Sequence, residues 1–84
     1  MNLPIRRERR KQPIRRSVQS ALELYFEDLH GTKVNDLYHV VLEEVEPAIL
    51  DVVMAHVDGN QSQAAELLGI SRGTLRKKLK TYQL

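Results

Sequence analysis

Residues 36–57 form one long apolar segment, and a chain of 84 residues has little with which to cover it. Its apolar side chains recur at helical spacing but cover more than one face, whereas a surface helix has a single apolar stripe. A chain of this length also forms only a marginal core unless something reinforces it. We therefore expect a second copy of the chain to cover the segment, with helices of two protomers interleaved. The predicted interface residues are Val41, Val45, Ile49 and Val52.

The segment is expected to be a single helix. Asn35 can cap a helix that runs from Asp36 to about Val57, which would span roughly 33 Å at 1.5 Å per residue. Pro47 lies inside it, where the missing N–H should kink the helix axis. The alternative is that two helices meet at Pro47. Because the apolar periodicity continues on both sides of the proline without loop residues, we expect one kinked helix.

The chain before this segment divides into a basic arm and a helix. Residues 1–12 contain five cations and have no helical or alternating apolar pattern, which predicts a flexible arm. From Pro13 apolar residues recur every three or four positions, which predicts an amphipathic helix that ends at His30 and Gly31. The expected regions are therefore the arm, a two-helix dimerisation region over residues 13–57, and a third region over residues 58–84.

The third region fits a helix-turn-helix over about residues 61–80. Asn60 is placed to cap a short helix over residues 61–68, with Ala65 and Leu68 on its inner side. Gly69 supplies a turn in which a positive φ is easily adopted, and Ser71 caps the second helix. On that helix the apolar face consists of Leu75, Leu79 and Tyr82, and the outer face of Thr74, Arg76, Lys77 and Lys80, with Arg72 and Lys78 on the flanks.

This distribution predicts a DNA-binding helix. A basic helix on its own is more often a solvated face, but here a short helix, a glycine turn and two caps precede it at the right spacing. The N-terminal turn of such a helix reaches base edges in the major groove, and the planar fork of Arg72 fits guanine O6 and N7. Lysines further along suit phosphates. The predicted base contacts are Arg72, Thr74 and Ser71, and the predicted DNA backbone contacts are Asn60, Ser62, Gln63, Arg76, Lys77, Lys78 and Lys80.

Charge along the chain is strongly segregated. Residues 1–16 carry +6, residues 17–57 carry −7 and residues 58–84 carry +3, which sum to the net charge of +2. A polyanion such as double-stranded DNA should therefore meet the two ends of the chain.

Composition argues against several other classes. There is no cysteine for a disulfide or a Cys-ligated zinc site, and no apolar run approaches the roughly 20 residues that span a bilayer. No catalytic motif is present. We expect a cytoplasmic protein that is not an enzyme and has no cofactor, metal, membrane or small-molecule partner. The three histidines, His30, His39 and His56, lack metal-site spacing, and the three neighbouring carboxylates, Glu43, Glu44 and Glu46, are expected to form a solvated face.

With these residues in view, the chain resembles the Fis family (factor for inversion stimulation) of bacterial nucleoid-associated proteins over about residues 13–84. The resemblance includes YFEDLHG, VNDLYHVVLEEVE, LDVVM, GNQSQAAELLGISRGTLRKKLK and the closing Tyr82. Activators of the nitrogen-regulation type share the C-terminal half alone, so the first two segments make the match specific.

The resemblance implies an all-α homodimer with four helices per chain, whose first two helices intertwine. It also implies two recognition helices closer together than one DNA turn, so that bound DNA must bend and deformable, degenerate sites are selected. Transcription regulation and chromosome compaction in the nucleoid follow from the resemblance, with RNA polymerase as a further candidate partner. The positions that match family DNA contacts are Asn60, Ser62, Arg72, Thr74, Lys77 and Lys78.

Three departures from the family pattern accompany this match. Ser71 stands where the best-known members have Asn, and Gln63 where they have Arg. The helix proline, Pro47, comes one residue early. In addition, the twelve residues before Pro13 lack the pattern of the β-hairpin arms of longer relatives. We therefore expect no efficient stimulation of DNA inversion.

Two other interpretations stay open. The chain could be the detached output domain of a larger activator, although Met1 and the complete first helix favour a free-standing protein. It could also be a helical dimerisation adaptor whose basic ends bind acidic partners or RNA. That interpretation leaves the spacing of the caps, Gly69 and Arg72 unexplained.

Overall fold

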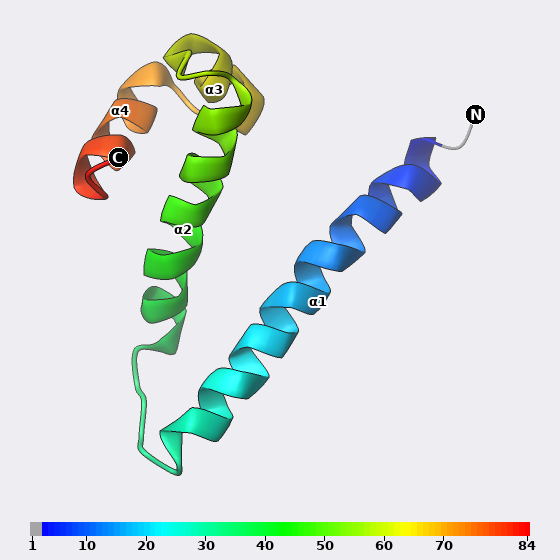
Figure 1. Ribbon diagram of the computed structural model, residues 1–84, viewed down its shortest axis with the longest axis vertical. Coiled ribbons are helices and arrows are strands. Elements are labelled where there is room, and N and C mark those ends of the chain that lie inside the picture. Colours follow the sequence, from blue (N-terminus) through cyan, green and yellow to red (C-terminus); the bar gives the residue numbers. More distant parts are fainter. Residues whose placement is uncertain (1–2) are drawn as a thin grey trace. The chain divides into compact units, whose positions relative to one another are not determined.

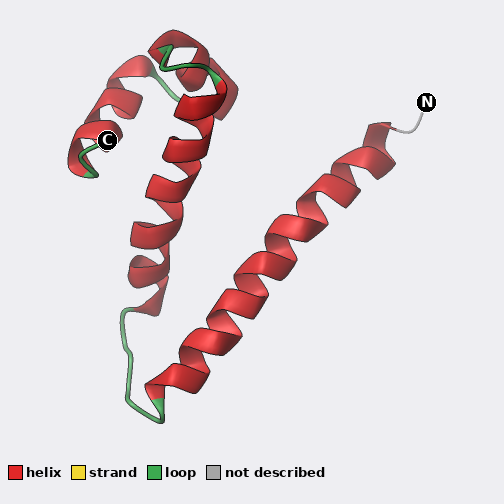
Figure 2. Ribbon diagram, viewed as in Figure 1, coloured by secondary structure: helices red, strands yellow, loops and turns green. Residues whose placement is uncertain are grey.

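The computed structural model describes residues 3–84, with side chains from residue 11 onward. All regular structure in this range is helical (Figures 1 and 2), so the predicted all-α fold with four helices is confirmed. The chain divides into two compact units, residues 1–35 and residues 36–84. The four helices are α1 (Leu3–Leu29), α2 (Leu37–His56), α3 (Gln61–Leu68) and α4 (Arg72–Thr81).

Helix α1 makes up the regular structure of the first unit, and it begins ten residues before the predicted start at Pro13. Residues 5–12 are mostly Arg, Lys, Glu and Gln, which are strong helix formers even where no apolar periodicity marks them. Residues 1–2 of the predicted arm lie outside the described residues, and the flexibility of the arm remains a prediction. The predicted end is confirmed, because His30 and Gly31 follow α1 with φ of 50° and 82°.

Helix α2 opens the second unit, and its start corrects the predicted cap. Asp36, not Asn35, precedes the helix, and its side chain makes no capping hydrogen bond. A backbone hydrogen bond forms the first turn instead: the Val40 N–H donates to the Asp36 carbonyl over 3.0 Å. Pro47 lies inside this one continuous helix, so two separate helices do not meet there. The kink at Pro47 remains a prediction.

The core of the second unit joins α2, α3 and α4, which lie together in Figure 1. Leu50 of α2 and Leu75 of α4 are almost fully buried, with exposed fractions of 2% and 0%. Ala64 and Ala65 of α3 complete the contact, because their small side chains allow the neighbouring helices to approach closely. Helix α4 packs mainly on α3, which in turn packs on α2. Around this core lie half-buried apolar residues: Val53, Met54, Val57, Leu68, Ile70 and Tyr82.

Outside this core, α2 carries apolar side chains that the rest of the second unit does not cover. Two of the four predicted interface residues, Val41 and Val45, are half-buried. Ile49 and Val52 are 45% and 70% exposed. No helix in the described range has an apolar stretch that could cross a membrane.

Candidate nucleic-acid interface

Two side-chain caps and a glycine turn hold the helix-turn-helix in place. Asn60 Oδ1 accepts a hydrogen bond of 3.1 Å from the Gln63 N–H at the start of α3. Ser71 Oγ accepts one of 3.1 Å from the Thr74 N–H at the start of α4. Between the helices Gly69 has a left-handed φ of 74°, a conformation in which a Cβ is strained. The two predicted caps and the predicted glycine turn are therefore confirmed.

Helix α4 separates buried from exposed side chains as the sequence predicts. Leu75 and Leu79 are buried and Tyr82 is half-buried, which places the predicted apolar face against the core. Five of the ten residues of α4 are Arg or Lys. Four of these are exposed, namely Arg72, Arg76, Lys77 and Lys80, while Lys78 is half-buried.

The predicted base-contact residues lie together at the N-terminus of α4, but their side chains are not equivalent. The Ser71 hydroxyl donates to Thr74 Oγ1 over 2.9 Å in addition to its capping bond. These two hydroxyls therefore bond each other in the free chain. Arg72 is exposed, and no described side chain forms a hydrogen bond or ion pair with its guanidinium. Arg72 is the base-reading candidate with the fewest competing contacts.

The predicted backbone contacts divide between α3 and α4. Asn60, Ser62 and Gln63 are exposed around the start of α3. On α4, Arg76 Nε donates to Gln61 Oε1 of α3 over 3.2 Å, which orients the guanidinium and leaves its terminal N–H groups for other acceptors.

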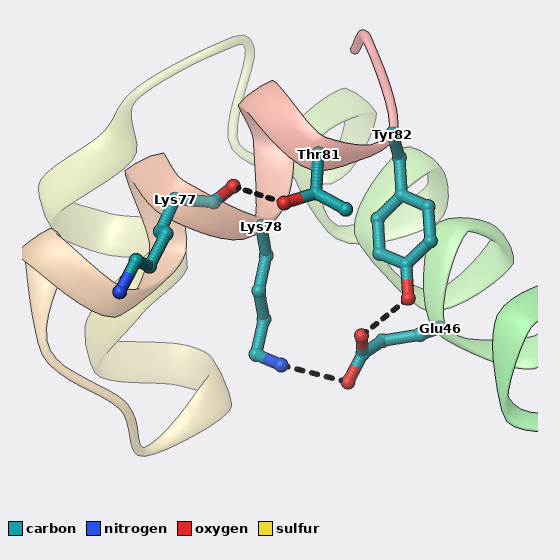
Figure 3. Close-up of polar contacts among 5 residues, drawn as sticks. All are labelled: Glu46, Lys77, Lys78, Thr81 and Tyr82. Atoms are coloured by element: carbon teal, nitrogen blue, oxygen red, sulfur yellow. Dashed lines mark hydrogen bonds and ion pairs between the residues drawn. The ribbon is translucent and has the colours of Figure 1, made fainter. Parts of the chain in front are cut away.

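Glu46 of α2 forms hydrogen bonds with Lys78 of α4 and with Tyr82, the residue that follows α4 (Figure 3). The Lys78 ammonium lies 2.9 Å from Glu46 Oε2, and the Tyr82 hydroxyl donates to Glu46 Oε1 over 2.6 Å. Both bonds lower the pKa of Glu46, Tyr82 contributing most, because each stabilises the carboxylate. The same hydrogen bond raises the pKa of Tyr82, since ionised Tyr82 could not donate it.

This role of Glu46 corrects the expectation of a solvated carboxylate face. Glu46 is half-buried and bonded to α4, whereas Glu43 pairs with His39 at 2.9 Å one turn away along an exposed stretch of α2. Two features of the sequence could have predicted this contact of Glu46. Glu46 precedes the buried Leu50 by four residues, which puts both on one face of α2, and the hydroxyl of a tyrosine on an inner face needs a partner.

The fold and the exposed basic α4 together define a helix-turn-helix protein. Residues 41–82 match the family described as "Bacterial regulatory protein, Fis family". The chain is 57% identical over 72 residues to "DNA-binding protein Fis" of Proteus mirabilis (strain HI4320), covering 86% of this chain and 74% of the relative. The proteins of the same name from Escherichia coli O1:K1 / APEC and Aliivibrio fischeri (strain MJ11) are 57% and 54% identical to the chain, again over 72 residues that cover 86% of this chain and 74% of the relative. The chain belongs to the Fis family of bacterial regulatory proteins.

Proposed function

We propose that this chain is a DNA-binding and DNA-bending regulator that acts as a homodimer and places α4 in the major groove. The observation that carries the proposal is the exposed basic face of α4, mounted on a helix-turn-helix whose caps and turn are all formed. Relatives named "DNA-binding protein Fis", more than half identical to the chain, support the same ligand.

Gly73 adds support for close approach to DNA. Glycine is disfavoured in helices, by about 1 kcal/mol relative to alanine in a helix interior, and Gly73 is the second residue of α4. A Cβ at Gly73 would meet only Ser71 Oγ, at 4.0 Å, so packing within the chain does not require glycine here. We infer that Gly73 lets the backbone at the start of α4 approach DNA.

The exposed face of α2 supports the dimer. Ile49 and Val52 are large apolar side chains that α3 and α4 leave exposed, together with Tyr38, which is 80% exposed. A second copy of the chain would remove this area from water. Two symmetric recognition helices would then contact DNA at once, with the duplex bent toward the protein if they stand closer than one helical turn.

This proposal places the protein in the cytoplasm with the chromosome, without an enzymatic activity, and makes RNA polymerase a candidate partner at promoters. The test is selection from random duplex DNA, with sequencing of the bound pool and measurement of the bend in selected fragments. A degenerate palindromic motif in bent fragments is expected. Binding that prefers RNA or acidic proteins over duplex DNA would instead support an adaptor.

A further inference from the structure

Glu46 brings a negative charge directly onto the basic recognition helix. Lys78 Nζ and Glu46 Oε2 are 2.9 Å apart, and the two side chains are 35% and 36% exposed. A carboxylate at this distance offsets the charge of the ammonium. The free chain therefore presents fewer positive charges to a polyanion than the five cations of α4 suggest.

Lys78 differs in this respect from the neighbouring cations. Lys77 points away from Glu46 in Figure 3, is exposed, and forms no ion pair with any described residue. Arg76 bonds to a neutral amide, Gln61, which does not offset the positive charge of the guanidinium. Among the described cations of α4, Lys78 alone has a carboxylate partner.

Tyr82 explains why the carboxylate stays in place. Its hydroxyl holds Glu46 Oε1 at 2.6 Å, which leaves Oε2 directed at Lys78 (Figure 3). An approaching phosphate must therefore displace Glu46 from the Lys78 ammonium or share that donor with it.

We propose that Glu46 is a specificity-determining residue that competes with DNA phosphate for Lys78 and so lowers affinity for DNA of any sequence. Phosphate contacts carry no base information, whereas base contacts by residues such as Arg72 do. Lowering the phosphate contribution increases the share of binding free energy that depends on sequence. The inference rests on the proposed DNA-binding function.

The test compares the salt dependence of binding to random-sequence duplex DNA for the full chain and Glu46→Gln. Glutamine keeps the size and a hydrogen-bond acceptor but removes the charge. The variant should bind more tightly at low salt, and its slope of log K against log salt should steepen by about one unit per engaged recognition helix. Each such unit corresponds to roughly a three- to fourfold additional loss of affinity between 50 mM and 200 mM salt.

Two controls separate competition for Lys78 from a general charge effect. Glu44→Gln removes the same charge from an exposed position of α2 and should leave the slope nearly unchanged. The effect of Glu46→Gln should also disappear when Lys78 is already alanine. Far-ultraviolet circular dichroism verifies that each variant is folded.

A second comparison works even if Glu46→Gln does not fold. Lys77→Gln should reduce the slope by about one unit per helix, whereas Lys78→Gln should reduce it by clearly less. Equal reductions, or an unchanged or shallower slope in folded Glu46→Gln, would overturn the inference while leaving DNA binding intact. A wild-type chain that fails to bind duplex DNA would overturn the proposed function and this inference with it.

Discussion

The Tyr82 hydroxyl donates a hydrogen bond of 2.6 Å to Glu46 Oε1, joining the residue after α4 to the middle of α2. Thirty-six positions separate the two residues in the sequence. Together with the contact of Glu46 with Lys78, this bond makes the attachment of α4 sensitive to the ionisation of one carboxylate.

Acid should weaken this attachment. The folded state lowers the pKa of Glu46 from its ordinary value of 4.5, so the contribution to stability is complete above that value and is lost as the pH falls through the lowered one. Urea unfolding of wild type and Glu46→Gln should give free energies that differ most near neutral pH and converge in acid. A difference that stays constant down to pH 3 would contradict the prediction.

Base should act through Tyr82. Folding raises the pKa of this hydroxyl above its ordinary value of 10.0, so its contribution is complete below that value and is lost as the pH rises through the raised one. Tyr82→Phe should therefore be less stable than wild type at neutral pH, with the gap closing in strong base. Equal stability of the two proteins at pH 7 would show that the bond contributes nothing.

Leu75→Ala should destabilise the second unit severely. The Leu75 side chain is fully buried among α2, α3 and α4, and truncating a buried leucine costs roughly 2–5 kcal/mol. Thermal or urea unfolding measures the loss. Leu67→Ala is the matched control, because Leu67 on α3 is 59% exposed and its truncation should cost far less.

Gly73→Ala should stabilise the fold and weaken DNA binding. Alanine is favoured over glycine by about 1 kcal/mol in a helix interior, so a smaller gain is expected in the first turn of α4, where space for the added Cβ is open. In the proposed complex, however, the added methyl group would lie between the start of α4 and the DNA. Urea unfolding and duplex binding, measured on the same preparation, test the expected gain in stability and the expected loss of affinity. Unchanged binding would show that Gly73 does not contact DNA.

Arg72→Ala should reduce specificity and not only affinity. Loss of a two-bond contact to guanine costs roughly 1–3 kcal/mol and flattens base preference at one position per half-site. Repeating the selection from random duplexes with the variant gives the measurement. If all sequences are weakened alike, Arg72 contacts phosphate and does not read a base.

Unfolding should depend on protein concentration if two chains cover the exposed face of α2. Val45→Asp would place an unpaired charge in that face and should prevent stable assembly. Equilibrium sedimentation and thermal unfolding over a hundredfold concentration range check this. Stable, well-folded monomers at micromolar concentration would contradict the dimer.

The sequence predicts best where one residue determines the local backbone. Asn60, Gly69 and Ser71 act on atoms a few positions away, so their spacing alone places α3 and α4. The start of α1 is predicted less well, because apolar periodicity does not mark a helix of charged residues. The role of Glu46 depends on Lys78, 32 positions away, and only the tertiary packing of α2, α3 and α4 brings the two together.

Leu50 and Ile49 are consecutive in α2, yet one is 2% and the other 45% exposed. Successive residues of a helix point about 100° apart. The side of α2 that carries Leu50 and packs in the core is therefore distinct from the exposed side that carries Ile49. Substitutions on one side of α2 can therefore have little effect on the contacts of the other side. If a second copy of the chain binds to the open side of α2, as proposed, substitutions that reposition α4 need not alter the dimer, and the two properties can change separately.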